Sequence, residues 1–171
     1  MFQGLTVQYR PTPCLGDLDA DGDLDLVVAR DAPWEYVHYI ENTGTPTSPQ
    51  WTDRGALTGV AFPTSSYIQV AMGDLDGDGD LDLVGSCDDP IIRCWKNVGT
   101  PQSFHFVENP SMLTGVGPVS PCPWGVALAD FNGDGHLDLL IAGWDQNYLY
   151  LNEPVSPVER TSWSVIKAMY R

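Results

Sequence analysis

Residues 17–25 of the chain are Asp17-Leu18-Asp19-Ala20-Asp21-Gly22-Asp23-Leu24-Asp25, an alternation of acids around one glycine. The pattern occurs twice more in the 171 residues, at 74–82 and 130–138. Asp74 follows Asp17 by 57 residues, and Asp130 follows Asp74 by 56. A fixed period of this size indicates a repeat architecture. We therefore predict one repeat domain over residues 1–171, with units at roughly 1–55, 56–110 and 111–171.

The segments around each acidic window have the composition of short β-strands. Each window leads into an apolar run, an aromatic-rich run follows, a third run carries a further aromatic residue, and a fourth precedes the window. The apolar runs lie at 24–29, 81–85 and 137–142, and the aromatic-rich runs at 36–40, 91–95 and 148–151. The third runs lie near Trp51, near Phe104 and Phe106, and near Trp163. The runs that precede the windows lie at 7–15, 67–72 and 124–129. Four short strands per repeat are the content of one propeller blade. We predict an all-β fold of three four-stranded antiparallel blades.

The acidic windows have the pattern of a loop that binds a hard cation. Acids recur at positions one, three, five and nine, and glycine at position six permits a sharp turn. Side chains at alternating positions converge, and the backbone carbonyl of position seven completes an all-oxygen shell that suits Ca²⁺ better than Mg²⁺. Without a metal ion, each close pair of carboxylates repels by about 4 kcal/mol at an effective dielectric constant of about 20. We therefore predict a calcium loop in each blade.

An EF-hand loop opens with the same spacing, but it needs a glutamate at position twelve and a helix on either side. Position twelve is Val28, Gly85 or Ile141 in this chain, and both flanks of each window have strand character. Position nine carries the last acid of each loop instead. The sequence therefore excludes an EF-hand.

Three copies of Asp-x-Asp/Asn-x-Asp-Gly-x-Leu-Asp-Leu, each leading a strand, resemble the calcium loops of the FG-GAP/VCBS repeat family. The resemblance covers nearly the whole chain and implies blades of the β-propeller type found in integrin α-subunits and many secreted proteins. It implies side-chain ligands at positions one, three, five and nine and a carbonyl ligand at position seven. These residues are Asp17, Asp19, Asp21, Asp23 and Asp25 in the first site, Asp74, Asp76, Asp78, Asp80 and Asp82 in the second, and Asp130, Asn132, Asp134, His136 and Asp138 in the third.

The three sites differ in charge. Asn132 removes one negative charge from the third site, so we expect that site to bind Ca²⁺ most weakly. Extracellular calcium modules have dissociation constants of about 10⁻⁴ to 10⁻³ M, and millimolar Ca²⁺ would then add up to roughly 1.5 kcal/mol per site. We therefore expect structural calcium and an extracellular or cell-surface location.

Charge and composition exclude several classes of protein. Lys and Arg number 8 against 23 Asp and Glu, and the formal net charge of −15 argues against nucleic acid as a partner. A hydrophobic content of 43% argues against a disordered chain. The longest purely apolar runs, such as 139–142, are far shorter than the roughly 20 residues that span a bilayer, so we expect no membrane insertion. No secretory leader is visible at residues 1–5, and we expect either a mature chain or a segment of a longer one.

The four cysteines give weaker signals. If the hairpin after residue 87 closes around Pro90-Ile91, Cys87 and Cys94 face each other, which leaves a cross-strand disulfide open. Cys14 and Cys122 precede different acidic windows, and we expect both to be small buried hydrophobic residues.

The sequence contains no catalytic motif of the serine-hydrolase, zinc-protease or Walker type, so we expect a non-enzymatic protein. Two alternatives stay open. Trp34, Trp95 and Trp144, near hairpin tips or strand ends, are candidates for sugar-stacking platforms of a carbohydrate-binding, lectin-like module. The other alternative is a fragment of a polysaccharide-degrading enzyme, because related propellers carry that activity.

Three blades are too few for a closed ring, since propellers close with roughly four to eight. We therefore predict a partial propeller or an open arc. Residues 1–10 and 162–170 resemble outer strands, and exposed blade faces at both ends favour self-association or contact with neighbouring blades of a larger protein. The predicted function is a calcium-stabilised repeat module for structural assembly, as an oligomer or filament subunit, or for adhesion.

Overall fold

The structure is a computed structural model that describes residues 10–31, 37–64, 66–100, 102–119, 121–153 and 162–167. These residues form three antiparallel sheets of four strands, together with one short 3-10 helix, η1 (Pro110–Leu113), and no α-helix. The all-β prediction is confirmed. Trp34 and the outer parts of the predicted end strands, 1–9 and 168–170, lie outside the described residues.

Each sheet comes from one continuous stretch of chain, and its strands are ordered in space as they are in sequence. We call the sheets blades 1, 2 and 3. Blade 1 contains β1 (Thr12–Gly16), β2 (Asp25–Ala29), β3 (Val37–Asn42) and β4 (Trp51–Ala56). Blade 2 contains β5 (Gln69–Gly73), β6 (Asp82–Cys87), β7 (Asp89–Asn97) and β8 (Phe106–Glu108). Blade 3 contains β9 (Pro123–Ala129), β10 (Asp138–Gly143), β11 (Asn147–Glu153) and β12 (Ser162–Lys167).

The second strands of blades 1 and 2 are apolar because both of their faces are covered. Every residue of β2 and of β6 is buried. Successive side chains of a strand point to opposite faces. Val27 therefore belongs to the apolar cluster between blades 1 and 2, while Leu26 and Val28 belong to a cluster on the other face of blade 1. Because alternate residues of β2 point to opposite faces and all of them are apolar or buried, blade 1 has an apolar cluster on each face.

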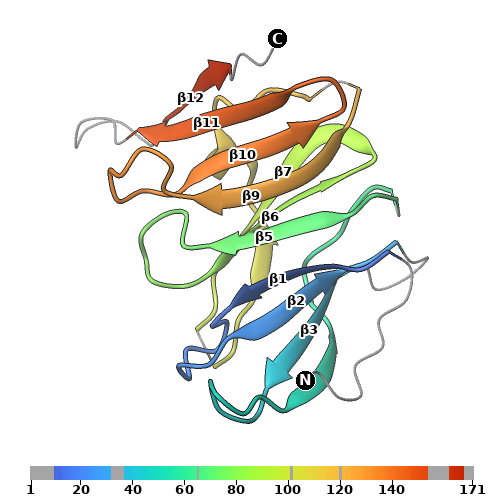
Figure 1. The fold of residues 1–171 in the computed structure, drawn as a ribbon, viewed down its shortest axis with the longest axis vertical. Coiled ribbons are helices and arrows are strands. Elements are labelled where there is room, and N and C mark those ends of the chain that lie inside the picture. The colour runs from blue at the N-terminus through green and yellow to red at the C-terminus, as the bar shows by residue number, and fades with distance from the viewer. Residues whose placement is uncertain are drawn as a thin grey trace.

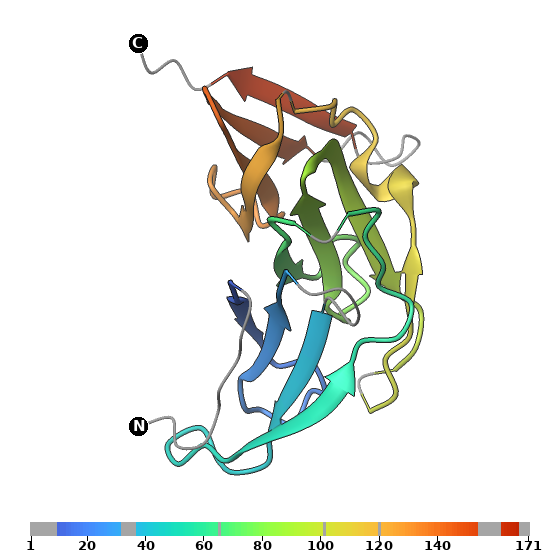
Figure 2. The same ribbon diagram turned by 90° about the vertical axis from the view of Figure 1, so that its right-hand side faces the viewer.

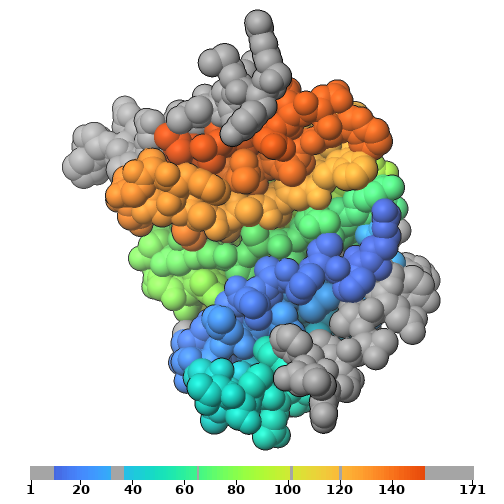
Figure 3. Space-filling model, viewed as in Figure 1, coloured from blue at the N-terminus to red at the C-terminus, as the bar shows by residue number. Residues whose placement is uncertain are grey.

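The blades lie side by side in a curved row. The inner strands are β1, β5 and β9, with β5 in contact with both of the others. Figure 1 shows these three strands running in the same direction, and Figure 2 shows them on the concave side of an open arc. The outer strands β4, β8 and β12 lie on the convex side in Figure 2, and Figure 3 shows blades 1 and 3 at opposite ends of the molecule. The described residues form an arc and not a closed ring.

Two apolar clusters hold the blades together. The first packs Val27 and Tyr39 of blade 1 against Leu83 and Trp95 of blade 2. The second joins blade 2 to blade 3 in the same way, through Leu75, Val84, Cys94, Leu139, Ile141 and Tyr150. A fully buried side chain of this size contributes about 1.5–3 kcal/mol. The hydrophobic stabilisation of the arc therefore lies mainly between neighbouring blades.

The hairpin that carries Cys87 and Cys94 differs from the predicted one. A register shift follows Gly85, so Cys87 pairs with Asp89 and Cys94 pairs with Val84. Cys87 lies in the cluster shared with blade 1, whereas Cys94 lies in the cluster shared with blade 3. The predicted opposition of the two cysteines is therefore wrong, because they face opposite sides of the sheet, and both are free thiols.

The other two cysteines are also free thiols and are partly buried. Cys14 packs against the cluster between blades 1 and 2, and burial raises its pKa to about 12. A thiol with such a pKa remains protonated and behaves as a small apolar side chain.

Candidate metal centre

Each acidic loop connects the inner strand of a blade to its second strand. Loops 1, 2 and 3 are residues 17–24, 74–81 and 130–137, and position nine of each window is the first residue of the next strand. The inner strands are parallel neighbours, so the repeat places all three loops on the same side of the arc, at the left in Figure 1. We call this side the acidic rim.

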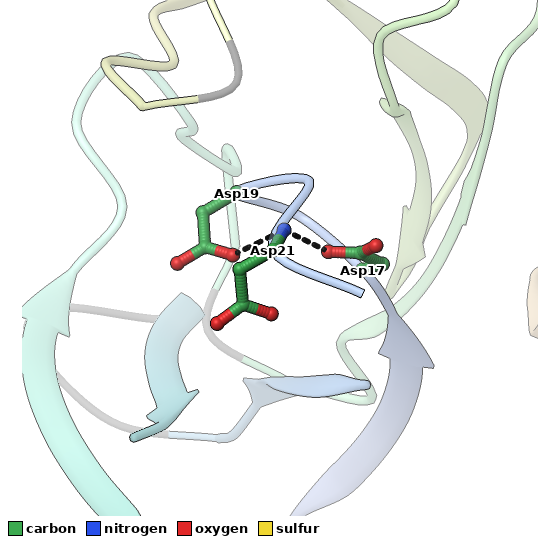
Figure 4. Close-up of side chains that lie close together, drawn as sticks. All are labelled: Asp17, Asp19 and Asp21. Carbon is green, nitrogen blue, oxygen red and sulfur yellow. Dashed lines mark hydrogen bonds between the residues drawn. The ribbon is translucent and has the colours of Figure 1, made fainter. Parts of the chain in front are cut away.

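Three carboxylates converge in loop 1. Figure 4 shows Asp17, Asp19 and Asp21 close together in this loop. Each offers one oxygen, and these oxygens lie within 4.8 Å of one another. Loop 2 repeats the arrangement with its residues at positions one, three and five, namely Asp74, Asp76 and Asp78. Oxygens that bind one Ca²⁺ at 2.3–2.6 Å lie within about 5 Å of one another. The separation of the carboxylates is therefore that of ligands to a single ion.

Hydrogen bonds to the carboxylate at position one wind each loop. In loop 1 the backbone N–H groups of Asp21 and Gly22 donate to the two oxygens of Asp17, each at 3.0 Å. In loop 3 Asp130 accepts N–H donors from the same two positions, at 3.1 and 2.9 Å. Position six has a φ of 94°, 95° and 89° in the three loops, a left-handed backbone that favours glycine.

Asn132 replaces the acid at position three in loop 3 without changing the turn. Its Oδ1 accepts the backbone N–H of Asp134 at 2.9 Å, and its Nδ2 donates to the carboxylate of the same residue at 2.9 Å. In loop 1 Asp19 accepts the equivalent N–H at 3.3 Å. The amide therefore preserves the loop while lowering its charge, and the weaker calcium affinity of loop 3 remains a prediction.

The aspartates at position nine have a structural role that the sequence analysis missed. Asp25, Asp82 and Asp138 are 1%, 0% and 0% exposed. One oxygen of each accepts the backbone N–H of loop position two, and the other accepts the N–H of the asparagine near the end of the next strand, at 2.8–3.1 Å. We call this pair of hydrogen bonds the aspartate clamp. It ties each acidic loop to the middle of its blade.

Burial of the clamp changes the acidity of its carboxyl groups. Burial raises the pKa of Asp25 and raises that of Asp82 to about 6, although the backbone hydrogen bonds oppose the increase. Desolvation disfavours the charged form of a carboxyl group, and a nearby cation favours it. The exposed Asp130 behaves in the opposite way, since backbone donors led by the N–H of Gly135 lower its pKa.

In blades 1 and 2 the asparagines whose N–H groups donate to the clamp aspartates also bind the turn between the third and fourth strands of the blade through their side chains. Asn42 is 2% exposed, and its Oδ1 accepts the N–H groups of Gly44 at 3.1 Å and Gln50 at 3.0 Å. Asn97 makes the same two contacts in blade 2, at 3.1 and 3.0 Å. The recurring Asn-x-Gly pattern was visible in the sequence as a turn, but its link to the acidic loop was not.

The side chain next to the loop differs between blades 1 and 2. In blade 1 the Tyr39 hydroxyl donates to Asp25 at 3.2 Å and to Asp19 at 3.4 Å. This neutral donor leaves the charge of loop 1 unchanged.

In blade 2 the Lys96 ammonium forms ion pairs with Asp76 and with Asp78, the latter at 2.9 Å. Lys96 lowers the pKa of Asp78. Loop 2 therefore holds an internal cation between two of the residues that the resemblance assigns to calcium.

The predicted carbonyl ligands at position seven lie within the turn. The backbone N–H groups of Asp23, Asp80 and His136 donate to the carboxylate at position five of their own loops, at 2.9, 3.1 and 2.8 Å. These contacts fix the backbone at position seven. The role of its carbonyl as a ligand remains a prediction.

The donor set of the loops fits calcium. Positions one, three and five of loops 1 and 2 offer convergent carboxylate oxygens. The buried carboxylate at position nine is not part of either convergent group, and its role as a ligand remains a prediction. Oxygen-rich sites of this kind suit hard cations and not the softer metals that prefer nitrogen or sulfur.

The sequence of the chain matches the FG-GAP-like repeat at residues 17–85 and 74–141. The chain belongs to the FG-GAP-like repeat family. Each match begins at an aspartate at position one and extends through the next acidic loop into the strand that follows it. The two matches start 57 residues apart, which is the spacing of the first two acidic windows. This confirms the resemblance seen in the acidic windows. No curated protein matches the chain in sequence.

No helix in the described part of the FG-GAP-like chain has the length and apolar character needed to cross a bilayer.

Proposed function

We propose that the chain is a non-enzymatic, calcium-stabilised repeat module for structural assembly or adhesion, in an extracellular or cell-surface setting. The observation that carries the proposal is the convergence of Asp17, Asp19 and Asp21, which recurs in loop 2. Membership of the FG-GAP-like repeat family supports the setting, because such repeats are typical of extracellular proteins.

Calcium would act as a cross-link within each blade. Positions one, three and five belong to the loop, whereas position nine is the buried first residue of the second strand. An ion bound to all four would relieve the repulsion between the carboxylates and join the loop to the core of the blade. At millimolar Ca²⁺ the gain is up to roughly 1.5 kcal/mol per site.

Thermal unfolding with Ca²⁺ and with EDTA tests this proposal. We expect removal of Ca²⁺ to lower the unfolding midpoint by roughly 5–15 °C, because about 1 kcal/mol shifts the midpoint of a domain of this size by about 2–4 °C. Isothermal titration should give three sites, and Mg²⁺ at the same concentration should have little effect. A midpoint that is identical in Ca²⁺ and EDTA would contradict the proposal.

A row of aromatic side chains favours a second candidate function, carbohydrate binding. The rings of Tyr67 and Trp124 stack at 5.7 Å, and those of Trp124 and Trp144 meet edge to face at 4.7 Å. Trp124 and Trp144 are 45% and 62% exposed. Trp95 is only 1% exposed and packs between blades, so its proposed role as a sugar platform is wrong. The flat, partly apolar faces of exposed indoles are surfaces on which a sugar ring can stack.

A cavity of about 180 Å³ lies beside this aromatic row. Arg10, Asp31, Tyr67 and Trp124 line it. The Arg10 guanidinium lies 4.4 Å from the centre of the Tyr67 ring and donates to Asp31 at 3.4 Å. Arg10 and Tyr67 both have a left-handed backbone, with φ of 53° and 57°, and strained residues of this kind cluster at ligand sites. Charged groups around an aromatic face supply hydrogen bonds for the hydroxyl groups of a sugar.

Screening on a glycan array, followed by titration of any bound oligosaccharide, tests this second candidate. We expect Trp144→Ala to weaken binding at least about five-fold, because stacking contacts of aromatic residues are worth about 1 kcal/mol. Val107→Ala is a matched control, since Val107 is 44% exposed and lies on the outer strand β8. Absence of binding to every glycan would remove the candidate and leave the calcium proposal untouched.

A further inference from the structure

Neighbouring blades meet through the same kind of contact at both interfaces of the chain, with a glycine of one blade against two apolar side chains of the next. Gly16, the last residue of β1, lies against Met72 and Leu81 of blade 2. A methyl group at Gly16 would be 2.9 Å from the Met72 side chain and 2.8 Å from that of Leu81. Gly73 of blade 2 lies in the same way against Leu128 and Leu137 of blade 3. The end of an inner strand is thus a socket for two apolar side chains of the following blade.

The rest of each interface repeats as well. The residue at position two of an acidic loop is buried against the following blade, with Leu18 2% and Leu75 7% exposed. The middle of the second strand is also covered, since Val27 and Val84 are each 0% exposed. Blades 1 and 2 therefore each have a socket face, which receives the next blade, and blades 2 and 3 each have a plug face, which inserts into the previous one. We use the same names for the equivalent faces of blade 3 and blade 1.

The plug face of blade 1 has no described blade against it. Leu15 and Leu24 occupy the positions that Met72 and Leu81 occupy in blade 2, and they are 57% and 55% exposed. They line a hollow of about 250 Å³ together with Trp51 and two prolines. The equivalent residues of the other two blades, Met72 and Leu81 in blade 2 and Leu128 and Leu137 in blade 3, lie against the preceding blade.

The socket face of blade 3 is open in the complementary way. Phe131 stands at loop position two and is 48% exposed, in contrast to Leu18 and Leu75. Leu140 and Leu149, which correspond to buried residues of blades 1 and 2, are only partly buried. Ala129 stands where the other blades have glycine, and its methyl group would displace only the flexible ends of partner side chains.

We propose that the socket face of blade 3 binds the plug face of blade 1 in a second copy of this chain, with Leu15 and Leu24 of one copy packed over Ala129 and Phe131 of the other. This contact would continue the two interfaces inside the chain, because the same repeat positions would meet in the same way. This inference rests on the proposed function in assembly and identifies its partner as the chain itself.

Such a contact joins two different faces, so it is heterologous. Each copy that binds leaves one socket face and one plug face open for further copies. A heterologous contact forms a ring when the rotation closes and a filament when it does not. The inferred assembly is therefore either a closed ring of copies or an extended filament.

Sedimentation velocity in Ca²⁺ over a wide range of protein concentration tests the proposal. We expect the wild-type chain to form species larger than a monomer as the concentration rises. Leu24→Ser and Phe131→Ser should each weaken this association at least about 30-fold, because a central interface residue of this kind contributes about 2 kcal/mol. Serine keeps the charge of both acidic loops unchanged. Val107→Ser removes an equally exposed apolar residue outside both faces and should leave association unchanged.

Mixing the two variants distinguishes the two faces. Leu24→Ser retains an intact socket face and Phe131→Ser retains an intact plug face, so an equimolar mixture should form a one-to-one complex that does not grow further. A wild-type chain that stays monomeric at every concentration, variants that associate as well as the wild type, or a mixture that stays monomeric would each overturn the proposal.

The unfolding midpoint of the same samples separates this inference from the proposed function. A calcium-dependent midpoint with a strictly monomeric chain would overturn the self-association alone. A midpoint indifferent to Ca²⁺ in a chain that associates would overturn the calcium proposal and leave the contact between copies supported.

Discussion

Loops 1 and 2 carry aspartates at the same four positions, yet the strands beside them present different charges. Lys96, near the end of β7, places its ammonium group between two carboxylates of loop 2. The corresponding position is Glu41 in blade 1 and Leu151 in blade 3. A divalent ion that binds both of those carboxylates in loop 2 competes with the positive charge of the lysine, whereas no described lysine or arginine pairs with the carboxylates of loop 1. In this repeat protein a neighbouring strand therefore modulates what an acidic loop can bind.

The comparison changes the expected order of affinities. From the charge within the loops alone, loop 3 is expected to have the lowest calcium affinity, because Asn132 replaces an acid. The ion pairs of Lys96 add a cost to loop 2 that loop 1 does not have. We predict that loop 1 binds Ca²⁺ most tightly of the three.

The largest expected effect concerns what the two loops share, the aspartate clamp. Asp25→Ala and Asp82→Ala should each lower the free energy of unfolding by about 3 kcal/mol, because each leaves two backbone N–H donors without their acceptor. The measurement is urea unfolding in EDTA, which removes any contribution from metal. Asp21→Ala is the control, since Asp21 is exposed and its loss should have little effect without calcium. Losses that differ strongly between blades 1 and 2 would show that the clamps are not equivalent.

The next effect tests the difference between the loops. Lys96→Met should raise the calcium affinity of loop 2 about five-fold, because a solvent-screened ion pair is worth up to about 1 kcal/mol. Isothermal titration would measure the change. Arg93→Met is the matched control, because it removes the same charge from a residue whose ion pairs are with Asp89 and Glu108. An equal gain in both variants would mean that net charge and not the position of Lys96 is responsible.

The smallest effect concerns position four of the loops. Ala20 in loop 1 has a φ of 57°, whereas Gly77 in loop 2 has a φ of 79°. Ala20→Gly should stabilise the protein by about 0.5 kcal/mol, because it relieves left-handed strain at a small entropic cost, and Gly77→Ala should destabilise it by about 1 kcal/mol. Chemical denaturation of both variants in EDTA would test this. Changes of the same sign would contradict the assigned backbone conformations.

Most of the fold was predictable because it depends on local patterns. The apolar run 24–29 and its counterparts are β2, β6 and β10, and the aromatic runs that follow are β3, β7 and β11. The hairpin of Cys87 was mispredicted because a register shift after Gly85 inserts residues that a symmetrical turn does not have. The hydrophobic pattern of the two strands does not indicate such a shift, because an extra unpaired residue changes the register without changing the composition.

The candidate site was predictable in part for the same reason. The side chains at positions one, three and five converge because the turn is local, and spacing alone predicts it. The clamp was missed because its partners, such as Asn42 for Asp25, lie about one strand and one hairpin further along the chain. Lys96 was missed because β7 follows loop 2 by a whole strand, and only the antiparallel pairing of β6 with β7 brings it back to the loop.

The sequence by itself determined that this protein is a threefold repeat of short strands with one acidic loop per unit, because the period, the alternation of acids and the glycine at position six are all local. Tertiary structure alone decided which loop meets a lysine, which aspartate is buried, and which leucines insert into a neighbour. The physical reason is that identical segments acquire different surroundings once they stack: Leu81 and Leu137 are inserted against the preceding blade, while Leu24 is exposed to solvent.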